Sequence, residues 1–458
     1  MHFLDYLIVS IYFVAVISIG FFRSKFSDTD SKKYILAGRR ISLPMFIATI
    51  VTTWYGGILG IGENTFNFGI QTWFIFGLPY YFFAILFAIF IAPRIHDKQL
   101  ISIPDHFHNS YGKIAGIIGG IFILLLASPA PYILSIGILV EFTIGIPFIY
   151  ALILATIFSF IYIWKGGFSA VVRTDVLQFL LMFGGFTLLI IFAWIKIGSP
   201  FAMFAQLPQS HLTPTGGNSI QYIVVWFFIA LWTFVDPGFY QRCAAAKSPQ
   251  IAQKGIIISV IFWFIFDMLT LTSGLYAKVF LTKQHGLFAF PALGQALLPP
   301  LFYGLFLTGL LATIMSTIDS LGFISAFTFG RDIIGRITKK GQISNSVHLT
   351  KIGLIIMSII AIILAYSFPS VVKLWYLIGS IIVPGLLIPF LITFTNLRLK
   401  NWQGIILLIL PVLISTLWFI LANFNFQATL LNLEPFYPGL FSSMILLTIF
   451  LIGQKYEQ

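Results

Sequence analysis

The side chains best suited to bind an ion form a run of hydroxyls inside a long apolar stretch. Ser316, Thr317 and Ser320 lie close together there, with the carboxylate of Asp319 between them. A hard monovalent cation takes oxygen ligands, and neutral hydroxyls with backbone carbonyls suit Na⁺ better than a divalent ion, which calls for converging carboxylates. We predict that Ser316 and Thr317 are ligands of Na⁺. The structural alternative is that these hydroxyls bond back to their own helix or to a neighbour.

A second candidate is Asp175, which follows Arg173 at the start of another apolar segment. Ionisable groups at membrane depth are costly and by default mark function. Two interpretations stay open: Asp175 is a charge partner for a helix N-terminus, or it is a stop on the inner exit path of the ion. Asp267 also lies in an apolar segment, but its neighbours in the sequence specify no role.

Two apolar segments are interrupted by residues that disfavour a continuous helix, TTWYGG at 52–57 and WTFVDPG at 232–238. Unwound backbone offers carbonyls to a cation and half-helix N-termini to an anion. Pro237 lacks an N–H and its ring clashes with the carbonyl four residues back, so the carbonyl of Thr233 should be free. A purely structural kink is the alternative. We predict that the substrate-binding residues lie at these breaks and are Thr52, Trp54, Gly56, Trp232, Thr233 and Asp236.

The elements that position these residues must be membrane-spanning helices. The 458 residues are 59% hydrophobic and only 9% charged, with a mean hydropathy of +0.99. Soluble folds are near 25% charged, so this chain has too little polar material to cover a globule in water. The composition excludes a soluble enzyme and a disordered regulator. The single cysteine, Cys243, excludes a disulfide scaffold.

Stretches long enough to cross a membrane, about 20 residues each, occur about thirteen times. They are 5–22, 41–64, 71–93, 113–139, 144–164, 174–197, 219–242, 254–277, 300–328, 348–366, 370–395, 404–422 and 437–453. If the N-terminus is outside, 22 of the 26 Lys and Arg fall in cytoplasmic segments, where positive charge collects. We therefore predict an external N-terminus and a cytoplasmic Gln458. This orientation explains the net charge of +12 without nucleic-acid binding.

The chain resembles the sodium/solute symporter family, which includes the proline, pantothenate and sodium/glucose symporters. The likeness covers almost the whole chain and rests on four motifs in order: LAGR at 36–39, GGFSAVVRTDVLQ at 166–178, QRC with AK at 241–247, and MST with DS at 315–320. The resemblance implies an all-α membrane protein with the leucine-transporter-type 5+5 inverted repeat. The single transporter domain, 1–458, would then comprise a first helix at 5–22, repeats at 41–197 and 219–395, and accessory helices at 404–453.

The resemblance also implies a sodium site between the first broken helix and the helix at 300–328. Its ligands would be the hydroxyls of Ser316 and Thr317 and the backbone carbonyls of Ile50, Thr53 and Thr313. The acid associated with sodium passage to the cytoplasm falls on Asp175. The Asn and Gln side chains of the sugar transporters are missing at 52–57, and Trp232-Thr233 stands where those transporters have an aromatic inner gate. The pocket is therefore expected to be aromatic, which argues against a sugar.

We expect a sodium-coupled secondary active symporter that imports a small organic solute by alternating access. Na⁺ is the coupling ion, and the protein is multi-pass in a bacterial inner (plasma) membrane. The alternative is a receptor-like or sensory module of the same fold without net transport. An enzyme is not expected, because neither paired carboxylates nor a His-rich face is present in the sequence.

Overall fold

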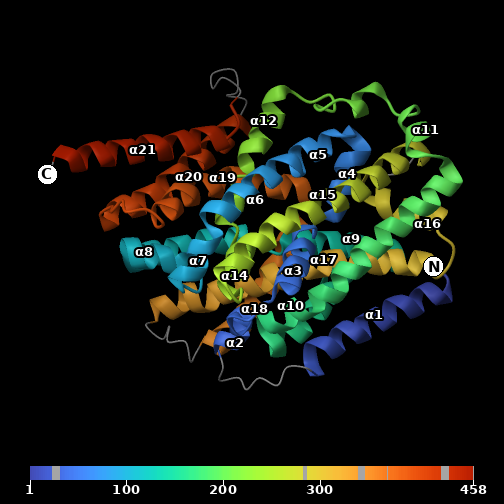
Figure 1. The fold of residues 1–458 in the computed structure, drawn as a ribbon, viewed down its shortest axis with the longest axis horizontal. Helices are drawn as coiled ribbons and strands as arrows, with labels where there is room; N and C mark the ends of the chain where they lie inside the picture. The colour runs from blue at the N-terminus through green and yellow to red at the C-terminus, as the bar shows by residue number, and fades with distance from the viewer. Residues whose placement is uncertain (23–30, 282–285, 339–345, 369, 424–432, 457–458) are drawn as a thin grey trace.

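The computed structural model describes residues 1–22, 31–281, 286–338, 346–368, 370–423 and 433–456, and it is built from helices (Figure 1). Their bounds are α1 Phe3–Phe22, α2 Ser31–Leu36, α3 Leu43–Trp54, α4 Ile58–Phe68, α5 Gln71–Phe76, α6 Leu78–Phe90, α7 Ala92–Lys98, α8 Ile103–Leu126, α9 Ala130–Ile144, α10 Phe148–Ile197, α11 Pro200–Phe204, α12 Ile220–Ile229, α13 Trp232–Val235, α14 Pro237–Ala245, α15 Pro249–Phe280, α16 Ala289–Leu297, α17 Phe302–Phe327, α18 Ser346–Ser367, α19 Val371–Ile392, α20 Asn401–Asn423 and α21 Phe436–Tyr456. In these ranges the β-structure is a single bridge between Ile41 and Ala246.

The membrane spans agree with the expected pattern, and one expected boundary between spans is a kink within a continuous helix. Among the described residues, 11 helices are long and apolar enough to cross a membrane, or 12 if the bent pair α3 and α4 is one span. The expected span 144–164 corresponds to the first part of α10, which begins at Phe148. This part ends at a kink at Gly167, whose φ is 54°.

The first predicted break is confirmed. α3 ends at Trp54, α4 begins at Ile58, and the two helices are bent by 56°. Glycine is required here by close packing: a Cβ on Gly56 would lie 2.3 Å from Cβ of Thr317, and one on Gly57 would lie 2.0 Å from the ring of Trp375. The break therefore lies directly against α17 and α19.

The second break lies between α13 and α14. Asp236 is extended, with φ −67° and ψ 117°, and its carboxylate accepts a hydrogen bond from the backbone N–H of Phe239 at 2.8 Å. Pro237 occupies the first position of α14, where its missing N–H costs nothing. Asp236 and Pro237 thus end one helix and start the next.

α17 forms the centre of the molecule and packs against α10, α3, α18 and α1 (Figure 1). Residues 306–328, which cover most of α17, are all buried, whereas only 28% of the most apolar 18-residue stretch is buried in each of α20 and α21. The exposed faces of the outer helices carry Leu, Ile and Phe side chains, as lipid contact requires. The hydroxyl run at 316–320 therefore lies in the protein interior, shielded from lipid.

Candidate ion and substrate site

The hydroxyl of Thr317 joins α17 to the broken end of α3. Thr317 Oγ1 donates a hydrogen bond to the carbonyl of Thr53 at 2.8 Å and lies 3.5 Å from the carbonyl oxygen of Thr313. The Thr53 carbonyl is accessible because α3 ends one residue later. Two of the carbonyl oxygens assigned to sodium by family resemblance therefore lie within 3.5 Å of a third assigned oxygen, Thr317 Oγ1.

The hydroxyl of Ser316 faces a different partner. Ser316 Oγ donates to Oδ1 of Asp175 at 2.6 Å and lies 3.4 Å from Oγ1 of Thr53. The second carboxylate oxygen of Asp175 accepts from the hydroxyl of Thr49 in α3. All these groups except Thr53 are fully buried. The structure thus brings Asp175, predicted from a separate motif, into direct contact with a predicted ion ligand.

A buried arginine completes this cluster. Nη2 of Arg242, in α14, donates to the hydroxyls of Thr49 at 2.9 Å and Ser320 at 2.8 Å, and it lies 3.7 Å from Oδ2 of Asp175. A charge in the protein interior requires a partner of opposite sign and hydrogen bonds; Asp175 supplies the opposite charge, and the hydroxyls of Thr49 and Ser320 accept hydrogen bonds from Nη2. The sequence analysis named Arg242 only as part of a family motif. The feature that could have revealed its role is its position, because it is a cationic residue next to an apolar segment.

Beside this cluster lies a cavity of about 100 Å³ between the two helix breaks. Of the predicted substrate residues, Trp54, Trp232 and Asp236 line it, and so do Ile50 and Thr53 from the predicted sodium set. The other predicted substrate residues are not among its lining residues, which are Ile50, Thr53, Trp54, Tyr55, Gly57, Ile61, Phe76, Tyr80, Leu126, Tyr132, Trp226, Trp232, Asp236, Gly238, Phe239, Arg242, Asp267, Leu321 and Trp375.

The three predicted substrate residues that do not line the cavity have other surroundings. The hydroxyl of Thr52 bonds back to the carbonyl of Ala48 at 2.9 Å. Gly56 packs against Thr317, and Thr233 is buried with 1% of its surface exposed. Side chains on a helix point in directions that change by about 100° per residue, so Trp54 and Trp232 face the cavity while Thr52 and Thr233 do not.

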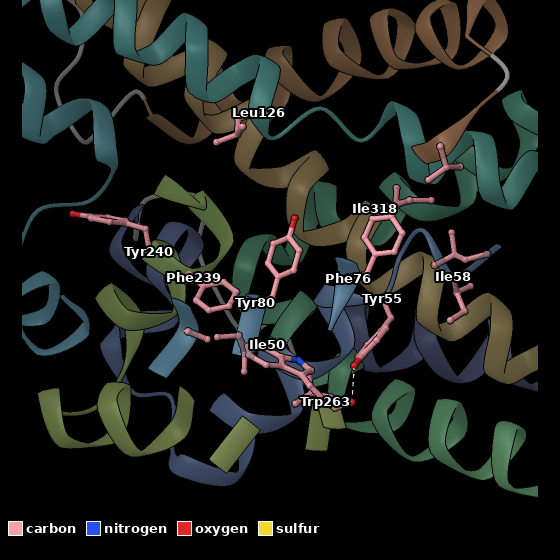
Figure 2. Close-up of a cluster of buried hydrophobic side chains, with 14 of the residues drawn as sticks. Ile50, Tyr55, Ile58, Phe76, Tyr80, Leu126, Phe239, Tyr240, Trp263 and Ile318 are labelled. Atoms are coloured by element: carbon pink, nitrogen blue, oxygen red, sulfur yellow. Dashed lines mark hydrogen bonds between the residues drawn. The ribbon is translucent and has the colours of Figure 1, made fainter. Parts of the chain in front are cut away.

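Sequence reasoning missed most of the cavity wall. Tyr80, Tyr132, Trp226 and Trp375 come from α6, α9, α12 and α19, and Asp267 comes from α15. Figure 2 shows Tyr80 within a cluster of buried hydrophobic side chains. In the same view the hydroxyl of Tyr55 donates a hydrogen bond to the carbonyl of Trp263 at 3.0 Å. The sequence of these five helices did not indicate a binding site, because each of them contributes a single residue to the wall.

Comparison with known proteins gives a consistent result. The family model described as the sodium:solute symporter family matches residues 34–406. "Sodium/proline symporter 2" of Staphylococcus saprophyticus is 24% identical over 387 residues, 79% of this chain and 75% of that protein. A sodium/proline symporter of Staphylococcus aureus is 24% identical over 384 residues, with the same coverage.

Two solved structures are similar along almost the full length. A Na⁺-coupled sialic acid symporter in a substrate-bound outward-open state has a TM-score of 0.81 at 19% identity, covering 98% of this chain and 97% of that one. A nucleobase-cation-symport-1 family transporter in a closed conformation has a TM-score of 0.58 at 11% identity, covering 91% and 93%. At these identities the likeness shows the fold, which is the expected leucine-transporter type.

Proposed function

The chain belongs to the sodium:solute symporter family, and from this membership we propose where its ion and its solute bind. It is a multi-pass integral membrane protein, a transporter that couples movement of a solute to Na⁺. The proposal places Na⁺ between α3 and α17 and the solute in the adjoining cavity. One observation carries it: the contact of Thr317 Oγ1 with the Thr53 carbonyl at the edge of that cavity.

The sodium ligands in this proposal are two hydroxyls and three backbone carbonyls. They are Ser316, Thr317, Ile50, Thr53 and Thr313. All are neutral oxygen donors, the set that suits a hard monovalent ion. Asp175, which accepts the Ser316 hydrogen bond, is the next oxygen group available to an ion that leaves this site, and this supports its role on the exit path.

The coupling follows from the shared boundary of the two sites. Thr53 belongs to the ion site and also lines the cavity. An ion that bridges α3 and α17 therefore sets the position of one cavity wall, so each ligand should favour the arrangement that binds the other. Na⁺ must then raise the affinity for the solute by the same factor by which the solute raises the affinity for Na⁺. Alternating access would release both ligands on the cytoplasmic side.

The solute in this proposal is small and organic, and it is imported. A volume of about 100 Å³ suits a compound of amino-acid size, and the relatives from Staphylococcus carry the name of a proline symporter. The bacterial relatives support a location in the plasma membrane. We further propose that the N-terminus lies outside the cell and that Gln458, which lies beyond the described residues, is in the cytoplasm.

The test is direct binding of ²²Na⁺ to the purified protein, with unlabelled Na⁺ or K⁺ as competitor. We expect saturable binding that Na⁺ displaces and that K⁺ displaces at least about tenfold less effectively, a difference of roughly 1.4 kcal/mol. Binding that K⁺ displaces equally well, or no saturable binding, would contradict the proposed ion site.

A further inference from the structure

We propose that the transported solute carries a positively charged nitrogen, and that Asp267 binds this nitrogen inside the aromatic wall of the cavity. The inference rests on the proposed function, because it names the class of solute for that same cavity. It is carried by the surroundings of Asp267, by the charges that line the cavity and by the kind of side chains that enclose it.

Asp267 lies in α15 and lines the cavity. Its Oδ1 accepts a hydrogen bond from the phenol of Tyr55 at 2.8 Å, and its Oδ2 accepts one from the phenol of Tyr81. Among the described residues no lysine, arginine or histidine forms an ion pair with it. A carboxylate inside a membrane protein is costly without an opposite charge. A cationic ligand would supply that charge.

The other charges at the cavity do not balance Asp267. Among the described lining residues Arg242 is the one cation, and its guanidinium is engaged by Asp175, Thr49 and Ser320. Asp236 is a further carboxylate, stabilised by the N-terminus of the nine-residue helix α14. The cavity therefore has an excess of negative charge, which attracts a cationic group and repels a solute whose only charge is a carboxylate.

The walls also favour a cation. Nine of the nineteen lining residues are aromatic, and four of these are tryptophan. The rings lie close together: the centroids of Trp54 and Tyr80 are 4.8 Å apart, and those of Phe76 and Trp226 are also 4.8 Å apart. Ring faces attract ammonium groups, tryptophan most strongly.

A polar group of the solute has a partner available in the same wall. The indole Nε1 of Trp226 is buried and makes no hydrogen bond within the described part of the chain, although Trp226 lines the cavity. A buried N–H without an acceptor is unfavourable. An oxygen on the solute would satisfy it, as in a hydroxylated ammonium compound or a zwitterionic amino acid.

The alternative role for Asp267 is structural. Its two phenol partners come from the helix break and from α6, so the carboxylate also ties these elements to α15. A structural tie predicts no preference among ligands of equal shape. The ligand-binding role predicts a preference for charged nitrogen, and this difference decides the test.

The experiment compares ligands that differ only at the nitrogen, using the purified full-length protein in Na⁺ buffer and its tryptophan fluorescence or melting temperature as the signal. Choline is paired with 3,3-dimethyl-1-butanol, in which carbon replaces the quaternary nitrogen. L-Proline is paired with cyclopentanecarboxylate, which keeps the ring and the carboxylate. We expect at least one nitrogen compound to bind at least about tenfold more tightly than its carbon partner. The inference is overturned if neither does.

Asp267→Asn then assigns this preference to the carboxylate. The variant should bind the nitrogen compound at least about tenfold more weakly and its carbon partner equally well, whereas structural damage would weaken both. Glu141→Gln, which removes a carboxylate from the exposed end of α9, is the matched control and should leave the preference intact. An unchanged preference in Asp267→Asn would overturn the assignment. If this variant does not fold, the ligand pairs on the wild-type protein decide alone.

The same samples separate this inference from the proposed ion site. Stabilisation by Na⁺ in the absence of any solute reports the ion site only. If Na⁺ stabilises the protein and the nitrogen compounds show no preference, the solute class is wrong while the ion site stands. If Na⁺ has no effect compared with K⁺, the proposed ion site itself is wrong.

Discussion

Nη2 of Arg242 lies 3.7 Å from Oδ2 of Asp175, and both side chains are fully buried. This ion pair joins α14, which follows the second helix break, to α10, and it lies against the hydroxyls of α3 and α17. The two repeats proposed from the sequence are thus linked through one buried pair of charges next to the proposed ion site. We therefore expect a change in charge at this point to affect both the stability of the protein and the binding of the ion.

Asp175→Asn should destabilise the protein, because it leaves the Arg242 guanidinium buried without its counter-charge. Breaking one partner of a buried pair costs about 3–5 kcal/mol. Thermal unfolding in detergent measures this effect. The double variant Asp175→Asn with Arg242→Gln is the control. Because it removes both charges, its loss of stability should be smaller than the sum of the stability losses of the two single variants. Additive losses would show that the pair is not energetically coupled.

Removing both proposed side-chain ligands should weaken sodium binding selectively. Ser316→Ala with Thr317→Ala deletes two oxygens and leaves the carbonyls, so the Na⁺ concentration for half-maximal stabilisation should rise at least about tenfold. Thr308→Ala is the matched control, since Thr308 carries a buried hydroxyl of the same helix that donates a hydrogen bond back to the carbonyl of Gly304 at 2.7 Å. Equal sodium dependence in both variants would place the ion elsewhere.

Two tryptophans of the cavity wall should determine solute affinity. Trp54→Ala and Trp232→Ala each remove a lining ring, and each should raise the concentration for half-maximal uptake at least about tenfold, roughly 1.4 kcal/mol. Solute uptake into proteoliposomes under an inward Na⁺ gradient measures this concentration. Trp402→Ala, on α20 with 52% of its surface exposed, should leave the affinity unchanged. Normal affinity in both cavity variants would mean that the solute binds at another place.

The first break should not tolerate a side chain at Gly57. A Cβ there would lie 2.0 Å from the Trp375 ring, whereas a Cβ on Gly60 would lie 3.2 Å from Val371. Overpacking costs about 1–3 kcal/mol, so Gly57→Ala should lower the melting temperature more than Gly60→Ala and should also weaken sodium binding through the neighbouring Thr53. Equal effects of the two substitutions would show that the close approach of the break to α19 is unimportant.

The topology is testable without any ligand. The thirteen spans expected from the sequence are an odd number, so they predict that the ends of the chain lie on opposite membrane faces, with the N-terminus outside as the distribution of Lys and Arg indicates. Reporter fusions at the two ends should therefore give opposite signals. Gln458 and the basic residues at 23–30 and 339–345 lie outside the described residues, so the fusions supply information that the helices alone do not. Signals of the same sign would show a miscounted span.

The features that the sequence predicted well are local ones. Apolar length defines a span, glycines and Pro237 interrupt a helix wherever it packs, and the α3–α4 break was found at the expected residues. The expected boundary between the spans 144–164 and 174–197 corresponds to the kink at Gly167 within the continuous helix α10.

The cavity wall and the buried ion pair were decided by tertiary structure. Trp54 faces the cavity while Thr52 does not, and Asp267, Trp226 and Trp375 meet there from three different helices. In a soluble protein, the contrast between polar and apolar faces reveals how each helix is rotated about its axis. Here lipid and protein interior are both apolar, so that contrast is missing and helix rotation is set by side-chain packing alone. Residue types and breaks can therefore be predicted from this sequence, but the side chains that meet in one site cannot.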